Sequence, residues 1–469
     1  MPFKRLAFAF IALFVLLIGP WPVDETHFQQ SQYAKNTFEH IKNLNPDINA
    51  SLIKAGTASV EITPLPGSPL AGYSARDPKA NTGAIEKLFA KAISISNNTN
   101  TTTLLSADLL LPMPELVTAI VKKTGLQRNQ IYFSTTHTHS GPGGYANGII
   151  ETASMGDFSQ KQFDMLVNSL SSAVIKSREN LQTVKIKYTR LELTPSFASQ
   201  FIHNQLYDIP QAHNSIHALE FKTVTRNMNE TNRLATLITF SAHPTFLGRI
   251  NRKLSGDYPG VLMRKLEKSL GGNVMFSVGA VGSMLPVSKE EKEITSIEIQ
   301  KKKLNTMGES LAHLITKSLM SSTEFDKSKV SNILSWSSSE VTIQSEVIPI
   351  ELPFPNYRLS DNLRLSPFLV NAIFHDNDTF IHALKIGKLF FLSYPADYSG
   401  ELATSLEQWA NDKDVYPWAT SFNGEYIGYI LPSRHYDKNH YSVRDVNFYG
   451  RWAGDFFLET SKQIIVKLK

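Results

Sequence analysis

The stretch that most constrains this chain is residues 134–145, which read Ser-Thr-Thr-His-Thr-His-Ser-Gly-Pro-Gly-Gly-Tyr. Residues 130–133, just before it, include isoleucine and aromatic side chains, which predicts a strand. Positions i and i+2 of a strand face the same way, so His137 and His139 are predicted to aim at one place. One histidine there would indicate ordinary packing at a strand end. A pair followed by glycines, which let backbone approach closely, favours a metal or catalytic site.

The composition excludes several kinds of chemistry. The 469 residues contain no cysteine, which rules out disulfides, thiolate metal ligands and a cysteine nucleophile. The net charge is +5 and the pI is about 9.0, but the basic residues are interspersed and form no stripe with aromatic residues. We therefore predict no nucleic-acid partner. A hydrophobic content of 42% is ample for a large core.

The N-terminal residues have the pattern expected of a targeting signal. Lys4 and Arg5 precede an apolar run over 6–18, which predicts a secretory signal peptide or an N-terminal membrane anchor within residues 1–23. No small-x-small cleavage pattern precedes Trp21, which favours a retained anchor. The positive charges would keep that end in the cytoplasm, so we expect an extracytoplasmic protein, periplasmic or at the cell surface, membrane-anchored or secreted. Residues 24–52 are polar and are predicted to form a tether.

Strand and helix patterns alternate through residues 53–469, which we interpret as one large domain. Apolar spacing over 114–123 predicts a helix that Gly125 ends, while alternation over 184–189 predicts a strand with one wet face. The nearly continuous apolar run 103–111 predicts a strand covered on both sides. Asp108 within it is a structural hydrogen-bond acceptor or a partner of the site. The predicted fold class is α/β, with layered mixed β-sheets flanked by helices.

Two later segments lead through a buried strand to a chemically useful residue. The segment 236–246 leads into His243, and 380–400 forms a hairpin and then delivers Asp397. Asp257 is expected in a turn within 255–260, and 423–445 is rich in tyrosine. Taken singly, an aspartate after a strand indicates a helix cap, and a tyrosine cluster indicates packing.

Together these motifs resemble the catalytic N-terminal domain of neutral ceramidases, the non-lysosomal zinc amidases. The resemblance covers most of the chain from residue 55, and its most specific part is Thr-His-Thr-His-Ser-Gly-Pro-Gly-Gly-Tyr at 136–145. It implies a Zn²⁺ ion held by two histidines, a carboxylate and a tyrosine. Carried over, the ligands are His137, His243, Asp397 and Tyr429, while His139 and Tyr441 are the catalytic side chains, with His139 either supporting the ligands or facing the substrate.

The sequence departs from the family pattern beside this set. Leu285 occupies the position of the family serine near the metal, and Ser283 stands at the position of an aspartate. The family arginine has no clear counterpart near 201–205, and Asp397 replaces a glutamate. The metal ligands are thus better preserved than the groups that recognise the ceramide amide.

Three functional hypotheses remain. The first is a zinc-dependent hydrolase that cleaves the amide of N-acyl sphingosine or a related lipid by metal-activated water, working at a membrane surface on a lipid-like small molecule. The second is a non-catalytic binding protein on the same fold, which Leu285 favours. The third is a serine hydrolase using Ser283, which is disfavoured because Gly282 and Met284 do not complete a Gly-x-Ser-x-Gly elbow.

Overall fold

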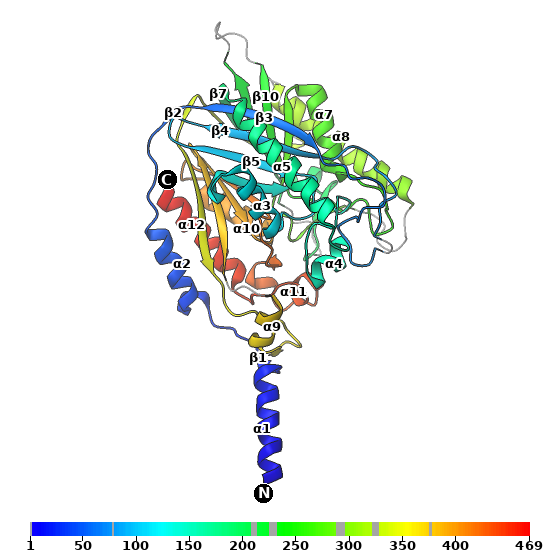
Figure 1. The fold of residues 1–469 in the computed structure, drawn as a ribbon. Helices are drawn as coiled ribbons and strands as arrows, with labels where there is room; N and C mark the ends of the chain where they lie inside the picture. Colours follow the sequence, from blue (N-terminus) through cyan, green and yellow to red (C-terminus); the bar gives the residue numbers. More distant parts are fainter. Residues whose placement is uncertain are drawn as a thin grey trace.

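A computed structural model describes residues 2–76, 79–207, 213–224, 232–287, 296–320, 328–374 and 378–469. Within these ranges two β-sheets lie face to face, with helices on the outer side of each (Figure 1). The prediction of layered mixed sheets flanked by helices in an α/β fold is confirmed.

The larger sheet is mixed. Its β10–β11 and β5–β6 pairs are parallel, and its other pairs are antiparallel. In spatial order its strands are β11 (Asn273–Val278), β10 (Arg233–Phe240), β9 (Ser215–Thr223), β7 (Gln182–Leu193), β3 (Lys54–Glu61), β4 (Phe89–Ser96), β5 (Thr101–Ala107) and β6 (Ile131–Thr135), with β13 (Val330–Ser338) also on β7.

The smaller sheet carries the C-terminal part of the site. Its order is β15 (Ile343–Glu351), β17 (Asp378–Ile386), β18 (Leu389–Tyr394) and β20 (Tyr416–Ser421). The β17–β18 pair is antiparallel and turns at Gly387, where φ is 57°, as the predicted hairpin requires. The β18–β20 pair is parallel and is connected through α10 (Gly400–Ala410).

Three apolar clusters hold these layers together. The inner cluster lies between the two sheets and includes Leu237 of β10 and Trp418 of β20, both almost fully buried. On the outer face of the larger sheet pack α3 (Pro114–Thr124), α5 (Gln160–Glu179), α7 (Asp257–Leu270) and α8 (Ile297–Met320). On the outer face of the smaller sheet pack α2 (Gln32–Lys42), α10 and α12 (Ala453–Leu468).

Short elements connect the layers and shape one end of the body. Three pairs of them are two-stranded antiparallel sheets: β1 (Trp21–Pro22) with β16 (Leu363–Arg364), β2 (Ser51–Leu52) with β14 (Glu340–Val341), and β8 (Ile202–Asn204) with β12 (Met284–Pro286). A fourth joins β19 (Asp397–Tyr398) to β21 (Tyr429–Ile430) in parallel. The remaining elements are α1 (Pro2–Leu17), η1 (Phe28–Gln30), η2 (Arg128–Gln130), α4 (Ile149–Met155), α6 (Pro195–Ala198), α9 (Pro367–Phe374), η3 (Ser433–His435) and α11 (Tyr441–Arg444).

Local sequence patterns located most of these elements. The predicted helix over 114–123 is α3, and Gly125 ends it in the left-handed conformation with φ 69°. The alternating segment 184–189 lies in β7, where Val184, Ile186 and Tyr188 are buried. Asp257, expected in a turn, stands at the first position of α7 with a left-handed φ of 54°, and its carboxylate accepts the N–H groups of Tyr258 at 2.8 Å and Leu247 at 3.0 Å.

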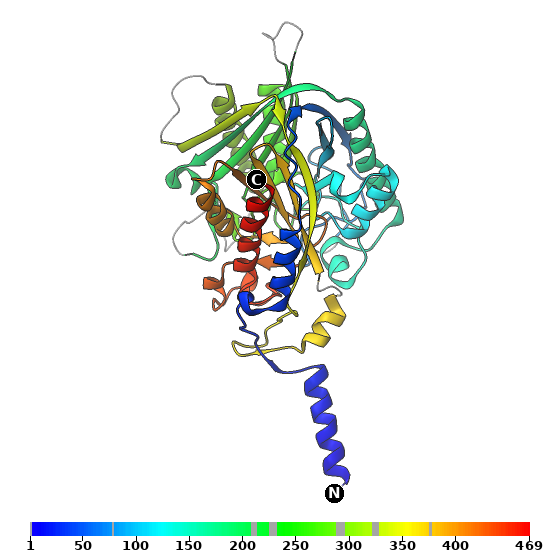
Figure 2. The same ribbon diagram turned by 90° about the vertical axis from the view of Figure 1, so that its left-hand side faces the viewer.

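The polar segment 24–52, expected as a tether, instead belongs in part to the body. Its helix α2 is amphipathic, and Ala34 and Ile41 are buried in the same cluster as α12, which lies beside it (Figure 2). The apolar positions are spaced at helical intervals, which a mainly polar composition had hidden. None of the helices in the described ranges combines the length and the apolar character that a membrane crossing demands.

Candidate metal centre

Three imidazole rings meet at the ends of two strands from the larger sheet. His137 and His139 follow β6, and His243 follows β10. The Nε2 atom of His243 lies 2.9 Å from that of His137 and 3.0 Å from that of His139, and the last two are 3.3 Å apart. The pair converges because the chain turns at His137, where φ is 57°, and not by strand alternation, since β6 ends at Thr135.

The hydrogen bonds of the Nδ1 atoms determine which nitrogen of His137 and of His139 carries the proton. His137 Nδ1 lies 2.8 Å from the carbonyl oxygen of Leu110, and His139 Nδ1 lies 2.9 Å from that of Gly72. A carbonyl oxygen only accepts hydrogen bonds, so each Nδ1 carries the proton and each Nε2 presents a lone pair. Neutral imidazoles held in this way by backbone oxygens are typical metal ligands.

Burial keeps the three rings neutral. Desolvation, followed by the neighbouring histidines, holds the pKa of His137 well below its ordinary value, and desolvation does the same for His139. Burial lowers the pKa of His243 to about 4, although a hydrogen bond to the backbone of Val281 opposes the shift. At neutral pH no proton therefore separates the converging lone pairs. A metal cation satisfies all three nitrogens at once.

Asp397 supplies a matching negative group. It lies in β19, is almost fully buried, and its Oδ1 is 3.9 Å from His137 Nε2 without a hydrogen-bond partner of its own. Its Oδ2 accepts the hydroxyl of Tyr426 at 2.9 Å. Burial raises the pKa of Asp397 to about 7, against the effect of that hydrogen bond. A cation beside Oδ1 would favour the charged carboxylate and satisfy the orphaned oxygen.

Both predicted tyrosines lie next to Asp397. Tyr429 is its direct partner in the β19–β21 pair, and its ring centroid is 6.1 Å from that of Tyr441. Burial and then the charge of Asp397 raise the pKa of Tyr429 well above its ordinary value. Tyr441 begins α11 and is 46% exposed, so it stands where the site meets solvent. The structure thus brings all six predicted site residues into one region, while their separate roles stay predictions.

A second group of buried histidines provides a contrast. His213 and His217 each place Nε2 3.0 Å from Oε1 of Glu407. Their Nδ1 atoms lie 2.7 Å from the Ser241 hydroxyl and 3.0 Å from the Tyr188 hydroxyl, respectively. Every ring nitrogen therefore already has a partner, and this group is a closed hydrogen-bond network. Both groups have the spacing of metal ligands, but only in the first are the converging lone pairs free to bind an ion.

Comparison with known proteins identifies the chain. Residues 54–292 match the family described as neutral/alkaline non-lysosomal ceramidase, N-terminal. The chain belongs to this family.

Its relatives are distant. It is similar to neutral ceramidase A of Dictyostelium discoideum, with 25% identity over 250 residues that make up 50% of this chain and 34% of the relative. It is also similar to the neutral ceramidase of Oryza sativa subsp. japonica, with 24% identity over 143 residues, 30% of this chain and 18% of the relative. The chain thus spans about a fifth to a third of these relatives' length.

A solved structure of a family member shares the fold. The crystal structure of neutral ceramidase from Pseudomonas aeruginosa superposes with a TM-score of 0.70 at 15% sequence identity, covering 89% of this chain and 74% of that one. The strand ends that hold the candidate metal centre therefore belong to a ceramidase fold.

Two side chains of this ceramidase-family protein were missed by sequence reasoning. Tyr426 donates to Asp397, and Phe422 stacks on His137 with ring centroids 4.2 Å apart. Tyr426 stands in the tyrosine-rich segment 423–445, but a tyrosine count gives no reason to choose it over its neighbours. Its contact depends on the β19–β21 pairing, which local sequence does not encode.

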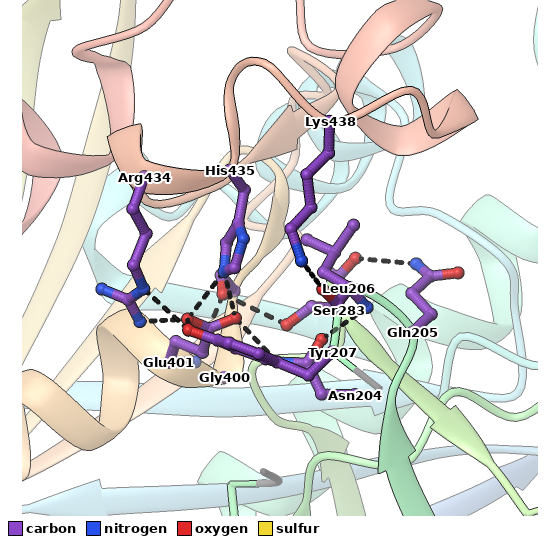
Figure 3. A network of polar contacts seen from close by, with 12 residues as sticks. Asn204, Gln205, Leu206, Tyr207, Ser283, Gly400, Glu401, Arg434, His435 and Lys438 are labelled. Carbon is purple, nitrogen blue, oxygen red and sulfur yellow. Dashed lines mark hydrogen bonds and ion pairs between the residues drawn. The ribbon is translucent and has the colours of Figure 1, made fainter. Parts of the chain in front are cut away.

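Glu401 anchors the wall of the site that carries Tyr441. Figure 3 shows its buried carboxylate surrounded by Arg434, His435, Asn204 and Tyr207. The distances to its oxygens are 2.9 Å from His435 Nε2, 2.7 Å from Asn204 Nδ2 and 3.2 Å from the Tyr207 hydroxyl, and Arg434 forms an ion pair with it. The network ties the start of α10, just after Asp397, to the segment that leads into α11.

Two of the departures from the family pattern, Leu285 and Ser283, lie on the same wall. Leu285 is in β12, and the carbonyl of its neighbour Met284 accepts the N–H of His243 at 3.0 Å. Ser283 is fully buried, and its Oγ is 3.2 Å from the Ser399 hydroxyl rather than beside an imidazole, which argues against a nucleophilic serine.

Asp108 is a structural acceptor, since its Oδ2 accepts the N–H of Phe89 at 2.9 Å.

Proposed function

We propose that the protein is a zinc-dependent hydrolase that cleaves the amide of N-acyl sphingosine or a related lipid. The observation that carries the proposal is the meeting of three neutral imidazole lone pairs beside an orphaned, buried carboxylate oxygen. Nitrogen and oxygen donors without a thiolate suit Zn²⁺. Membership of the ceramidase family and the names of its relatives support the choice of a lipid amide.

The residues divide between holding the metal and handling the substrate. His137, His243, Asp397 and Tyr429 would hold the ion, and the Nε2 of His139 lies close enough to join them. A zinc ion bound here supplies Lewis-acid polarisation of the amide carbonyl and activates a water.

The substrate side would be handled by the residues nearest solvent. Tyr441, at the exposed edge, can donate its hydroxyl to the developing oxyanion or to the leaving amine. That hydroxyl donates a hydrogen bond to Gln205 Oε1 at 3.3 Å, and a substrate oxygen or nitrogen could replace this acceptor. In this assignment His139 assists at the same carbonyl when it is not bound to the ion.

The alternative is a non-catalytic binding protein. Leu285, which lies beside the residue bonded to His243, favours it because a leucine cannot hydrogen-bond a substrate as a serine can. The predicted setting remains extracytoplasmic and membrane-attached, which the exposed apolar helix α1 supports.

Chelation separates these possibilities. Metal content and hydrolysis of a fluorescent N-acyl sphingosine would be measured on the full chain before and after treatment with 1,10-phenanthroline. We expect one zinc per chain, loss of turnover on removal and recovery when zinc is restored, because the carbonyl would no longer be polarised. Turnover that persists without metal would overturn the zinc mechanism, and bound zinc without turnover would support the binding protein.

Tyr426→Phe tests the support of Asp397 more finely. Loss of the hydroxyl leaves Oδ2 without its donor, and such outer partners contribute about 10- to 100-fold to metal affinity. We expect zinc affinity, measured by competition with a chromophoric chelator, to fall within that range. Tyr33→Phe in α2, remote from the site, is the matched control. Unchanged affinity in Tyr426→Phe would contradict a ligand role for Asp397.

A further inference from the structure

An apolar collar surrounds the place where α1 leaves the body. We define the collar as Trp21, Phe354, Leu359, Leu363 and Phe368. Four of these side chains are between 40% and 55% exposed although they are large and apolar. They are contiguous in part: the ring of Phe368 lies 5.8 Å from that of Trp21 and 6.5 Å from that of Phe354.

The helix that rises from the collar is apolar on every side. From Leu6 to Ile18 it has no polar or charged residue, and Phe8 and Phe10 are more than 70% exposed. Figures 1 and 2 show it projecting away from the body, so nothing in the described chain covers it. A helix that is hydrophobic all round lies in a protein core or in a membrane. A single protein partner would cover one side of it, whereas lipid covers all sides.

Hydrogen bonds connect the collar to the end of α1. Ser366 donates its N–H to the carbonyl of Ile18 at 3.0 Å and its hydroxyl to that of Leu16 at 2.8 Å. Arg364 donates Nε to the carbonyl of Pro22 at 3.0 Å, within the β1–β16 pair. The orientation of α1 therefore fixes how the collar faces whatever surrounds the helix.

The two arginines of the collar segment are turned inward. Arg358 and Arg364 are 8% and 7% exposed, and each donates to a backbone carbonyl. Asp361 stays exposed but is paired with Arg444 at 2.5 Å, which offsets its charge. The exposed large side chains around it are aromatic residues and leucines, with Trp21 at the base of α1. Tryptophan in that position is typical of the boundary between water and lipid.

The collar segment also contacts the part of the chain that carries Tyr441, the exposed residue of the candidate site. Arg358 donates to the carbonyls of Tyr436 at 2.9 Å and of Val443 at 3.1 Å, and Val443 lies in α11, which begins at Tyr441. In Figure 1, α9, α11 and the base of α1 share one end of the body.

From these observations we propose that the collar rests on a lipid bilayer into which α1 inserts. At about 1.5 Å per residue, the 16 residues of α1 reach about 24 Å, so the collar would sit close to the membrane surface. Tyr441, the half-exposed residue of the candidate site, then lies at the end of the body that faces the membrane, so a lipid amide would have a short path from the bilayer to the site. This last consequence rests on the proposed function, whereas contact with lipid does not.

Single-cysteine labelling tests the contact directly, because the chain has no cysteine of its own. Phe354→Cys, Phe368→Cys and Leu13→Cys in α1 would each carry an environment-sensitive fluorophore on the full chain in phosphatidylcholine vesicles. Val466→Cys, 66% exposed on α12 near the C-terminus, is the control. We expect blue-shifted emission and quenching by nitroxide lipids at the first three positions and water-like emission at the control.

Other results would overturn the proposal. Water-like emission at 354 and 368 with a lipid-embedded label at 13 would show that the collar stands off the membrane. Water-like emission from the label at position 13 would show that α1 does not insert into the bilayer, which would overturn the whole proposal. Blue-shifted emission at 354 and 368 without quenching by the nitroxide lipids would show that a second copy of the chain covers the collar.

A turnover assay separates this proposal from the proposed function. For Phe354→Ser combined with Phe368→Ser we expect hydrolysis of N-acyl sphingosine in vesicles to fall at least about tenfold, the cost of losing one buried aromatic side chain. Hydrolysis of a short-chain, water-soluble N-acyl substrate should be unchanged, which also shows that the variant folds. Equal losses on both substrates would contradict a role in lipid access. Inactivity of the wild type on both would count against the proposed function and leave the labelling result intact.

Discussion

Replacing His137 with alanine is expected to remove bound metal and, with it, hydrolysis of the lipid amide. The Nε2 atom of His137 lies 2.9 Å from that of His243 and 3.9 Å from Asp397 Oδ1, so it joins the nitrogen and oxygen donors. Loss of an outer partner alone costs about 10- to 100-fold in metal affinity, so loss of a ligand should cost at least about 100-fold. Zinc content of the purified chain and turnover should fall together.

A control variant must show that removing a histidine away from the site has no effect on zinc content or turnover. His313 is an exposed residue of α8, on the outer face of the larger sheet, and His313→Ala should keep both zinc and turnover. His243→Ala should behave like His137→Ala, since its ring completes the same cluster. His139→Ala then decides the role of the third ring. Loss of metal would make it a ligand, and loss of turnover with metal retained would make it catalytic. Full zinc occupancy in His137→Ala would contradict the site.

Glu407→Ala is expected to destabilise the fold by about 3–5 kcal/mol, because removal of one partner leaves a buried polar network unsatisfied. Glu407 accepts hydrogen bonds from His213, His217 and Ser215, and Arg190 Nη1 lies 3.6 Å from its Oε2. With the carboxylate gone, two imidazole N–H groups and a guanidinium lose their partner between the smaller sheet's α10 and the larger sheet. A lower urea midpoint would report the loss.

The control and the pH dependence sharpen this test. Glu309→Ala breaks an ion pair with Lys265 in which both side chains are 51% exposed, and should change stability by less than about 1 kcal/mol. Burial opposes the charge of Glu407, but the histidines outweigh it and hold its pKa well below 4.5. A carboxylate whose pKa is lowered by folding stabilises the folded state at pH values above its pKa in the unfolded chain, and this stabilisation is lost as the pH falls. The gap between wild type and Glu407→Ala should therefore shrink in acid. A pH-independent gap would contradict the ionised network.

Much of the architecture was predictable from local pattern. Gly125 ends α3 because only a residue tolerant of positive φ continues the chain there, and the alternation around Val184 marks β7 because neighbouring strand residues face opposite sides. His243 and Asp397 each follow a short apolar run, but their assignment to the site, like that of Tyr429 and Tyr441, came from the resemblance to the ceramidase family. Periodicity failed for α2, where a polar composition concealed one buried face.

What the sequence determined by itself was a layered α/β body with histidines and a carboxylate placed after buried strands. Only the tertiary structure decided that the Nε2 atoms of His137 and His243, 106 residues apart, lie 2.9 Å from one another, that Tyr426 rather than another tyrosine supports Asp397, and that the collar gathers at the base of α1. The physical reason is the sequence separation of the interacting residues. Side-chain periodicity and backbone conformation depend on neighbouring residues, whereas the order of the strands depends on the packing of the whole core.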